Sequence, residues 1–432
     1  MNTRVAVIGS GIAGLAAAHA LRHEARVTLF EAAGHFGGHA HTVDVTLDGV
    51  TAGVDTGFLV FNHRTYPGLT QLFAQLGVAT APSEMSFSVQ VPRAFGARKL
   101  EWSGSDLAGV FSQRANLVRP RFWRMLAELA RFNALATRLA QSGAADALDE
   151  PLGDFLDRHR FGRELRDWYL LPMTACIWSC PTDAMLRFPV GTLVRFCHNH
   201  GLLQVTDRPQ WHTVQGGSRQ YVNRIVAQLP DARASTPVRR IVRHDEGVDV
   251  VTDHGSSRFD QVVLATHPGQ ALALLADPTQ REQEVLGAIR YQPNRAVLHT
   301  DAAVLPTRQR AWAAWNYEAG VAEQAGRVCL HYLINRLQPL PWKRPVIVSL
   351  NPLREVDPAS VLGEFDYDHP VFDAAAIRAQ ASVASLQGTR RTFYCGAWAG
   401  YGFHEDGLSA GQSAARALLA SAMAAPSLEA AA

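Results

Sequence analysis

Three glycines and one glutamate near the start of the chain have the types and spacing needed to hold a dinucleotide. Gly9 permits a tight turn, Gly11 lets a pyrophosphate reach backbone N–H groups, and Gly14 allows a helix to pack closely. An anion bound there lies at a helix N-terminus, where exposed amides and the helix dipole stabilise it. Glu31 follows Gly11 by 20 residues and can accept hydrogen bonds from a ribose 2′-hydroxyl, whereas it would repel a 2′-phosphate.

The elements that must position these residues lie directly around them. An apolar run from Val5 to Ile8 precedes the glycines, an Ala/Leu-rich helix follows, and a second apolar run from Val27 to Phe30 ends on Glu31. A glycine triplet alone is weak evidence in an Ala-rich chain. Strand, glycine turn, helix, strand and acid in this order predict a Rossmann βαβ unit.

A second glycine pair makes the pattern more specific. Gly37 and Gly38 follow Glu31 as E-x-x-x-x-x-G-G, and residues 55–58 read DTGF. With the dinucleotide motif, these segments resemble the flavin amine-oxidase and phytoene-desaturase superfamily of FAD enzymes. Most members carry Arg after the glycine pair, where this chain has His39. The resemblance implies FAD as the cofactor.

Two later segments resemble the same superfamily. FDQVVLATHP (259–268) is similar to the strand end that follows a three-stranded insert, and Val238 matches the position whose backbone meets the adenine. FYCGAWAGYGFHEDGLSAGQSAA (393–415) is similar to the strand, loop and helix start that close the flavin site. The motif and the resemblance imply these FAD-binding residues: Gly9, Gly11, Ile12, Ala13, Gly14, Glu31, Ala32, Gly37, Gly38, His39, Thr56, Gly57, Phe58, Val238, Ala265, Thr266, Gly396, Asp406, Gly407 and Leu408.

The resemblance implies an α/β fold with a discontinuous, Rossmann-like FAD-binding domain of the GR2 type. It also implies an α+β substrate domain with an antiparallel sheet and a helical cap. The expected divisions are FAD-binding segments at 1–80, 206–285 and 389–425, a cap at 81–205, a substrate sheet at 286–388 and a flexible tail at 426–432.

Local patterns predict several elements. Residues 119–140 and 152–166 have apolar positions at helical spacing. MSFSVQV from Met85 alternates like a strand, with residues 99–102 as its hairpin partner. Alternation over 294–350 predicts an antiparallel sheet, and the last helix is expected to open within residues 407–411.

A flavin dehydrogenase removes a hydride through N5 of the flavin, so the protein must position a carbon atom and move a proton. The sequence shows no Ser-His-Asp, paired-carboxylate or metal motif, and we expect no metal. The catalytic candidates are Tyr401, His404 and Glu405 in the C-terminal loop. His404 has the ordinary pKa best suited to proton transfer near neutrality. In the alternative interpretation, His404 and Glu405 only hold the loop or bind FAD.

Within the superfamily, the segments FGGHAHTVDV, DTGFLVFN, LVRPRFWRML and GYGFHEDGL are most similar to a bacterial branch of predicted NAD/FAD-binding flavoproteins. These are often encoded beside cyclopropane-fatty-acid-synthase-like methyltransferases. The resemblance implies a fatty acyl substrate, with methylated and phospholipid-bound chains both compatible, and a lipid methyltransferase in the same pathway. We expect desaturation by hydride transfer to flavin N5. The alternatives are an FAD-dependent double-bond isomerase, an amine oxidase and a non-catalytic flavoprotein partner of the methyltransferase.

Charge and composition limit the partners. The 432-residue chain has a net charge of +2, which gives no support for nucleic-acid binding. Its first strand begins almost at once, so we expect no signal peptide and a cytoplasmic location. Five scattered cysteines indicate buried free thiols in a reducing compartment. The basic helix between Arg119 and Arg138 is either a solvated face or a peripheral contact with anionic lipid, on the inner face of the membrane.

Overall fold

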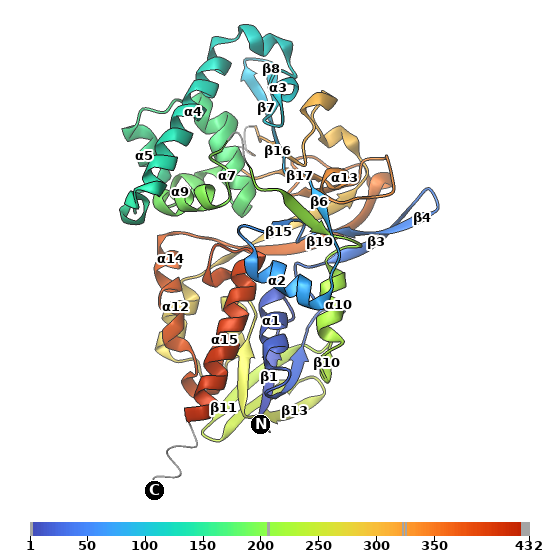
Figure 1. Ribbon diagram of the computed structural model, residues 1–432, viewed down its shortest axis with the longest axis vertical. Coiled ribbons are helices and arrows are strands. Elements are labelled where there is room, and N and C mark those ends of the chain that lie inside the picture. Colours follow the sequence, from blue (N-terminus) through green and yellow to red (C-terminus); the bar gives the residue numbers. More distant parts are fainter. Residues whose placement is uncertain (1–2, 205–207, 322–323, 325, 425–432) are drawn as a thin grey trace.

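The chain folds into two lobes that lie one above the other (Figure 1). The computed structural model describes residues 3–204, 208–321, 324 and 326–424. Both ends of the described chain lie in the lower lobe of Figure 1, and the helical cap lies in the upper lobe. The predicted flexible tail, 426–432, lies outside the described residues.

A five-stranded parallel sheet organises the lower lobe. Its strands come from three separate parts of the sequence, as a discontinuous FAD-binding domain requires. The strand order is β10 (Asp231–Arg233), β2 (Arg26–Phe30), β1 (Arg4–Ile8), β14 (Gln261–Leu264) and β20 (Thr392–Tyr394). The three central strands are buried along nearly all their length, and this buried part is apolar except for Thr28 and Gln261, because layers cover both of their faces.

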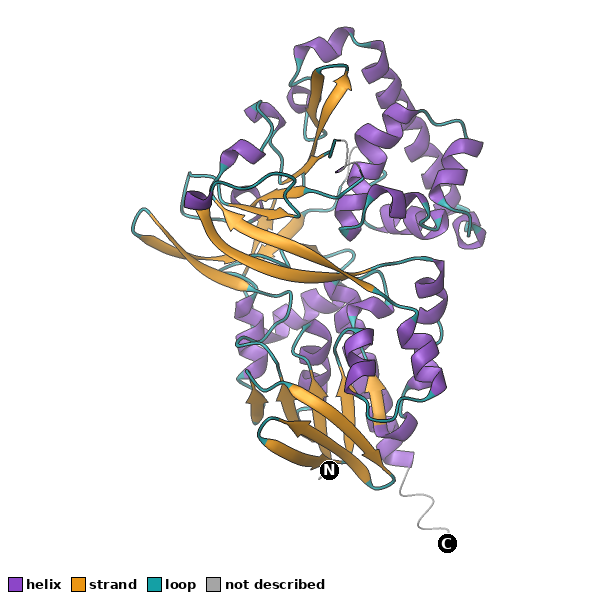
Figure 2. Ribbon diagram, turned by 180° about the vertical axis from the view of Figure 1, so that it is seen from behind, coloured by secondary structure: helices purple, strands orange, loops and turns teal. Residues whose placement is uncertain are grey.

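Those two layers use alternate residues of β1. Val5 and Val7 pack toward α1 (Ile12–Leu21) and α15 (His404–Ala424), whereas Ala6 and Ile8 pack toward a three-stranded antiparallel sheet. Figure 2 shows this small sheet across the face of the parallel sheet. It contains β11 (Val238–His244), β12 (Gly247–Thr252) and β13 (Gly255–Phe259), which confirms the predicted insert. The other helices of this lobe are α2 (Pro67–Leu76), α10 (Arg219–Val226), α11 (Pro268–Leu274), α12 (Gln280–Gly287) and α14 (Ala374–Gln380).

A seven-stranded sheet runs through the upper lobe. Its order is β19 (Val361–Pro370), β15 (Tyr291–His299), β18 (Ile347–Leu350), β17 (Leu330–Leu333), β16 (Trp315–Glu318), β7 (Phe87–Phe95) and β8 (Arg98–Ser103). It extends from β15 and β19 beside the lower lobe to β7 and β8 near α3 (Leu107–Val110) (Figure 1). The predicted hairpin, β7 with β8, therefore belongs to this sheet and not to the cap. The pairing is antiparallel as predicted, except that β7 and β16 run parallel.

Short strands connect the lobes. The hairpin of β3 (Thr42–Leu47) and β4 (Val50–Asp55) projects from the molecule (Figure 2). A further small sheet contains β5 (Phe61–Asn62), β9 (Trp211–Val214) and β6 (Thr80–Ser83). The chain thus passes between the lobes more than once.

The cap is helical, as predicted. It contains α3 (Leu107–Val110), η1 (Arg114–Val118), α4 (Pro120–Gln141), α5 (Leu152–Arg158), α6 (Arg163–Leu165), the π-helical turn η3 (Arg166–Leu170), α7 (Leu171–Trp178), α8 (Thr182–Leu186) and α9 (Val190–Asn199).

The predicted single helix over 152–166 is wrong, because α5 ends at Arg158 and residue Arg160 has a positive φ of 55°. The last helix also begins three residues earlier than predicted, at His404 instead of Gly407.

The five cysteines are buried and free, as predicted. Among the described residues, no helix combines the length and the apolar character needed to cross a bilayer.

Candidate functional site

A cavity of about 1080 Å³ runs from the predicted dinucleotide turn into the upper lobe. Both lobes contribute to its wall: β1, the start of α1 and the residues that follow β14 below, and α7, α9 and the seven-stranded sheet above. The C-terminal segment before α15 lies between these two parts. One continuous space can therefore hold a cofactor and a substrate together.

The glycine turn is shaped as the sequence predicts. Gly9 has a φ of 97°, and a Cβ there would lie 2.8 Å from the Ala265 carbonyl oxygen. A Cβ on Gly14 would lie 1.9 Å from the Gly9 oxygen, so this position packs the helix on the sheet. A Cβ on Gly11 would meet no atom within 4 Å, because Gly11 faces the cavity. Gly38 packs against Gly11, where its own Cβ would lie 3.1 Å from the Gly11 Cα.

Glu31 lies at the end of β2 and in the cavity wall. The backbone N–H and hydroxyl of Ser10 donate to its Oε2 at 2.9 and 2.6 Å. The backbone N–H of Ala33 donates to its Oε1 at 2.8 Å. These three donors fix the carboxylate and leave one lone pair, on Oε1, that can accept a hydrogen bond from a ribose hydroxyl.

His39 stands where the superfamily usually has Arg, and its Nε2 is inaccessible to solvent with no hydrogen-bond partner among the described residues. Its ring contacts Tyr367 and His369, with centroid distances of 4.9 and 5.3 Å. Burial and then the charge of His267 lower the pKa of His39 to about 4, which keeps the ring neutral. A buried ring nitrogen without a partner requires an explanation. A cofactor oxygen in the cavity would supply that partner.

Asp55 fixes the DTGF segment through a buried network. Its carboxylate accepts hydrogen bonds from Thr42, Ser218 and Gln338 at 2.6 to 3.0 Å. Burial raises the pKa of Asp55 to about 6. Since these three partners come from different segments of the chain, the network places the following residues, 56–58, in the cavity wall.

Most of the predicted FAD-binding residues line the cavity. These are Gly9, Gly11, Ile12, Ala13, Glu31, Ala32, Gly38, His39, Thr56, Gly57, Phe58, Val238, Ala265, Thr266 and Gly396. The remaining ones, Gly14, Gly37, Asp406, Gly407 and Leu408, support the wall from behind or beside it. For example, a Cβ on Gly407 would lie 2.7 Å from the Ile12 side chain, and Leu408 is part of the core. The glycine turn, the Glu31 acceptor and the unpartnered His39 nitrogen fit FAD.

The three catalytic candidates separate into two groups. Tyr401 and His404 line the cavity. Glu405 does not: its carboxylate accepts hydrogen bonds from the backbone N–H groups of Gly68 and Leu69, at 2.7 and 2.9 Å, at the start of α2. This position supports the alternative interpretation that Glu405 holds the loop, and leaves Tyr401 and His404 as candidates.

His404 is held between two rings. It stacks on Phe58 with a centroid distance of 3.7 Å, and its Nε2 lies 3.2 Å from the Tyr221 hydroxyl. Burial, with a smaller contribution from His39, lowers the pKa of His404 to about 3. The sequence favours His404 as a proton carrier because the ordinary pKa of histidine lies near neutrality. In this buried environment His404 does not have that pKa, so this reason is wrong. A neutral, oriented imidazole is what the structure provides.

Sequence reasoning missed the part of the cavity wall on β19, which contains Asp366, Asp368 and Pro370 as well as three ring side chains. Phe365, Tyr367 and His369 line the wall next to His39, and the Tyr367 hydroxyl lies 2.6 Å from the Thr56 hydroxyl. A signal was present, because the three rings recur at every second position and therefore share one face of a strand. The segment did not resemble any cofactor motif.

The upper part of the cavity is apolar. It is lined from the cap by Tyr169, Met173, Ile177, Trp178 and Phe196, and from the sheet by Phe87, Trp315, Tyr332, Val348 and Leu350. Of the aromatic residues on β16 and β17, Trp315 and Tyr332 are in this wall. Trp312 and Tyr317 are not in the wall; Tyr317 is buried in the core.

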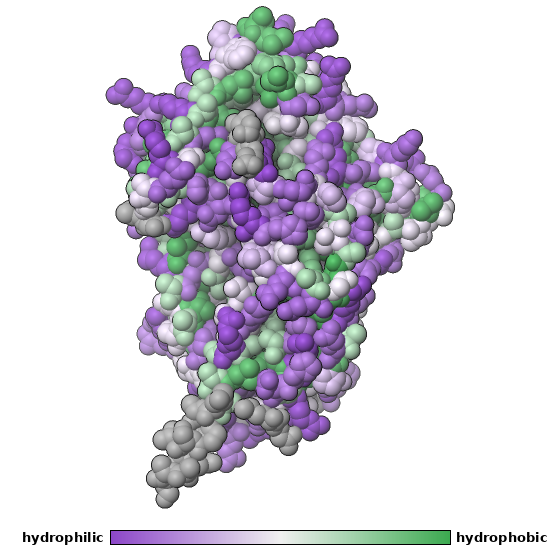
Figure 3. Space-filling model, viewed as in Figure 1, coloured by the Kyte–Doolittle hydropathy of each residue, from purple (hydrophilic) through white to green (hydrophobic). Residues whose placement is uncertain are grey.

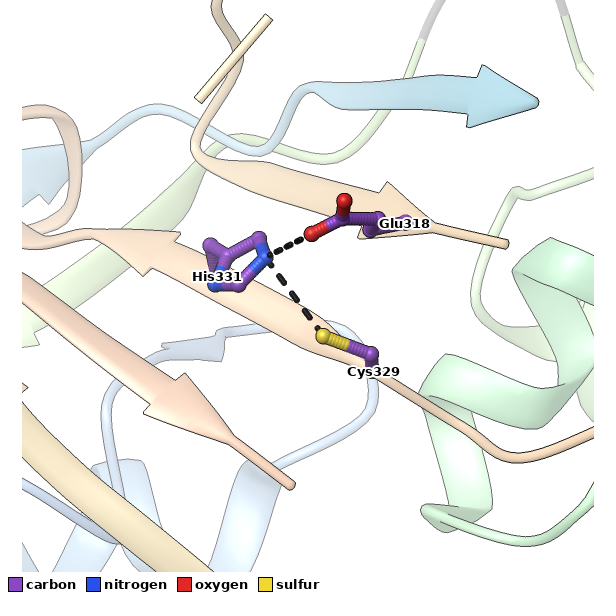
Figure 4. A group of neighbouring side chains, drawn as sticks. All are labelled: Glu318, Cys329 and His331. Carbon is purple, nitrogen blue, oxygen red and sulfur yellow. Dashed lines mark hydrogen bonds and ion pairs between the residues drawn. The ribbon is translucent and has the colours of Figure 1, made fainter. Parts of the chain in front are cut away.

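A buried polar cluster lies on the opposite face of the same sheet (Figure 4). His331 Nε2 is 3.1 Å from Glu318 Oε2 and 3.4 Å from Cys329 Sγ. This is the one group of described residues whose atoms are close enough to hold a metal ion. Side chains alternate along β17, so His331 faces away from the cavity that Tyr332 lines.

Hydrogen-bond directions explain this cluster without a metal. The Asp301 N–H donates to His299 Nδ1, so His299 Nε2 carries a proton and donates to Ser349 Oγ at 2.7 Å. Ser349 can then donate to His331 Nδ1, also at 2.7 Å, which leaves the proton of His331 on Nε2, facing Glu318. Burial lowers the pKa of His331, but Cys329 and Glu318 outweigh it and raise the value to about 9. In both protonation states Nε2 is a donor and has no lone pair for a metal.

Comparison with known sequences identifies the family. The family model for flavin containing amine oxidoreductases matches residues 12–315. An inferred flavin-containing monoamine oxidase of Mycobacterium tuberculosis, AofH, is 29% identical over 289 residues, which are 63% of this chain and 59% of the relative. The chain thus matches about three fifths of the length of this curated relative.

Solved structures share the fold over almost the whole chain. A CLA-producing fatty acid isomerase from P. acnes has a TM-score of 0.68 at 16% identity, covering 95% of this chain and 97% of that one. Putrescine oxidase bound to putrescine has a TM-score of 0.67 at 16% identity, covering 97% and 99%. Cyclohexylamine oxidase from Brevibacterium oxydans IH-35A has a TM-score of 0.66 at 18% identity, also covering 97% and 99%.

These structures establish the fold, and the family model spans well over half of the sequence. Since the cavity also offers the residues that FAD requires, the chain belongs to the flavin containing amine oxidoreductases, a family of FAD-dependent oxidoreductases.

Proposed function

We propose that this flavoprotein desaturates a fatty acyl chain. The supporting observation is the upper cavity wall, which α7, α9 and strands β7, β16, β17 and β18 build from aromatic and aliphatic side chains. Among the described residues, these elements contribute no carboxylate to the wall. A long apolar substrate gains free energy from burial against such a surface, whereas a dication such as a polyamine would find carboxylates of the described cavity wall only outside this surface, at Glu31 and at Asp366 and Asp368 on β19.

Two arginines of the described chain, Arg239 and Arg208, line the same cavity. Arg239 lies beside Val238 in the lower lobe and pairs with Asp253 at 2.8 Å. Arg208 follows α9, is exposed and donates from Nε to the Gln204 carbonyl at 2.8 Å. Its remaining N–H groups have no ion-pair partner in the described part of the chain. This arrangement suits the carboxylate or phosphate head of an acyl lipid.

The reaction breaks two C–H bonds and forms one C=C bond. One hydrogen leaves as a hydride, which bound FAD would accept, and the other leaves as a proton, which is released to solvent. The apolar wall excludes water and orients the chain, while Tyr401 and His404 border the space beside the cofactor-binding residues. Because His404 is neutral, it can hydrogen-bond a reacting group without adding a charge.

A second candidate, double-bond isomerisation, is favoured by the shared fold with a CLA-producing fatty acid isomerase. Both reactions need a hydride acceptor close to an apolar chain. They differ in the product, since isomerisation leaves the mass unchanged and desaturation removes two hydrogens.

Product analysis tests the proposal. Purified holoenzyme is incubated with free fatty acids, with phospholipids carrying the same chains, and with mono- and diamines, and products are identified by mass spectrometry. We expect an acyl product with two hydrogens fewer, and a KM at least about tenfold higher for Arg208→Ala than for Arg208→Lys. An acyl product of unchanged mass would support isomerisation. Amine products alone would contradict both.

A further inference from the structure

The cap ends in a surface on which apolar and basic side chains lie together; we call it the tip surface. Its apolar members are Leu107, Leu117, Val118 and Trp123, and its basic members are Arg114, Arg119 and Arg124. These four apolar residues are among only six large hydrophobic side chains that are exposed in the described chain. Val118 is 82% and Leu107 78% exposed. Exposure on this scale, concentrated at one place, marks an interaction site.

Figure 3 shows hydrophobic side chains at the end of the molecule that carries α3 and the adjacent part of α4 in Figure 1, with hydrophilic side chains around them. This end lies opposite the lower lobe. The residues come from α3, η1 and the first turns of α4, which are consecutive in the sequence.

Specific contacts hold the apolar residues in place. Trp123 Nε1 donates to the Leu117 carbonyl at 2.9 Å, and the Trp123 ring packs on Phe111 with a centroid distance of 5.5 Å. The Phe111 N–H donates to the Leu107 carbonyl at 3.1 Å. The exposed side chains therefore sit on an ordered scaffold, and the indole N–H of Trp123 already has a protein carbonyl as its acceptor.

The tip surface has a net positive charge, because its three arginines outnumber Asp106, an exposed carboxylate beside them that has no ion-pair partner in the described chain. Asp106 caps α3 by accepting from the Gly109 N–H at 2.6 Å. Glu101 binds Lys99 and Arg308, and Glu164 binds Arg121. In the part of the chain that the structure describes, Arg114 and Arg124 have neither a hydrogen-bond nor an ion-pair partner. Burial and then the charges of Arg98 and Arg308 lower the pKa of Arg119, consistent with excess positive charge.

We propose that the tip surface binds an anionic lipid bilayer, with Leu117, Val118 and Trp123 entering the interface and the arginines contacting lipid phosphates. Exposed apolar side chains ringed by arginine are complementary to both layers of such a surface. A membrane contact there also lies close to the cavity, because Gly104, three residues before Leu107, is part of the cavity wall.

Vesicle sedimentation with the full-length holoenzyme tests this proposal without any turnover. Vesicles contain phosphatidylcholine alone or phosphatidylcholine with phosphatidylglycerol. We expect binding to the anionic vesicles, weaker binding to the neutral ones, and loss of binding at high salt. Arg114→Ala and Arg124→Ala should each weaken the affinity by about fivefold, and Val118→Asp should weaken it by more than tenfold.

Matched control variants lie elsewhere on the molecule. Val50 is 47% exposed at the β3–β4 hairpin, and Arg240 is exposed on β11. Val50→Asp and Arg240→Ala should bind vesicles like the wild-type protein, and retained flavin absorbance will show that every variant folds. Binding that is equal for all variants, or absent with every vesicle, would overturn the proposal. So would dimerisation through this surface, seen as a Val118→Asp-sensitive mass in light scattering.

Discussion

Gly11 provides a direct test of the cofactor position at the level of one residue. Its φ of −59° suits any residue, and a Cβ there would meet no protein atom within 4 Å. We expect Gly11→Ala to fold with an unchanged melting temperature as apoprotein, but to bind FAD at least about tenfold more weakly, because the methyl group occupies the pyrophosphate position. Flavin absorbance after reconstitution measures this.

Gly287 on α12 is the matched control, since a Cβ there also meets nothing within 4 Å. Gly287→Ala should leave FAD binding unchanged. Equal FAD affinity of both variants would place the pyrophosphate elsewhere.

His404 and Glu405 are neighbours with different surroundings, so they can be separated by substitution. His404→Asn should keep FAD bound and lower kcat by at least about tenfold, because the oriented ring beside Phe58 is lost. Glu405→Ala should retain kcat but lower the free energy of unfolding by ~1 kcal/mol, because two N–H groups at the start of α2 lose their acceptor. Steady-state kinetics and denaturant unfolding measure the two effects. The reverse pattern would return Glu405 to the catalytic set.

The sequence could identify these two residues as part of the loop but not their separate roles. Because they lie just before Gly407 and Gly411 in the sequence, we expect them near the flavin site. Whether a side chain points into the cavity or toward α2 depends on how α2 packs beside α15, which no local pattern reports. The shifted pKa of His404 has the same origin, since burial is a property of the folded surroundings.

At the scale of elements, the contact between α1 and α15 holds the phosphate-binding helix in place. A Cβ on Gly411 would lie 2.1 Å from the Ala13 carbonyl oxygen. Gly411→Ala should force the helices apart, lower the free energy of unfolding by about 1–3 kcal/mol and weaken FAD binding. Thermal unfolding with and without added FAD measures both effects.

Ser409 on the same helix is exposed and serves as the control. Ser409→Ala should change neither quantity. A Gly411→Ala protein with wild-type stability would show that the close approach of α1 and α15 is not required.

The elements could be predicted where local periodicity and capping agree with the fold. The βαβ unit, the basic helix α4 and the hairpin of β7 with β8 are of this kind. The break between α5 and α6 was missed, because Phe161 and Leu165 are four residues apart and look helical although α5 ends at Arg158. The parallel pairing of β7 with β16 joins residues more than 220 positions apart and has no sequence signal of its own.

At the scale of the whole molecule, buried histidines dominate the expected pH dependence of stability. Burial is the main cause that lowers the pKa of eight histidines to about 3 or 4; these are His19, His39, His41, His200, His267, His299, His369 and His404. At pH values between these lowered pKa values and the ordinary pKa of 6.5, the eight histidines bind protons in the unfolded chain but not in the folded chain. Stability is therefore lost as the pH falls from 6.5 to about 4.

Other buried groups act in the opposite direction but are fewer. Burial raises the pKa of Asp55 and Asp406 to about 6, so each favours the folded state at low pH and loses that contribution as the pH rises to 6. His331, with its pKa raised to about 9, stabilises below 6.5 and loses this contribution as the pH rises through 9. The melting temperature should peak near pH 6.5, fall steeply below it because of the eight histidines, and decline by a smaller amount toward pH 9 as the contribution of His331 is lost. A constant melting temperature from 4 to 6.5 would contradict this.

The central claim is that the apolar cavity presents an acyl chain to the flavin, and anaerobic flavin reduction tests it most directly. Holoenzyme is mixed without oxygen with an acyl lipid or with an amine, and the visible absorbance of the flavin is recorded. We predict that the acyl lipid bleaches the oxidised flavin and yields one product molecule with two hydrogens fewer per flavin. Bleaching by amines, with none by any acyl lipid, would contradict the claim.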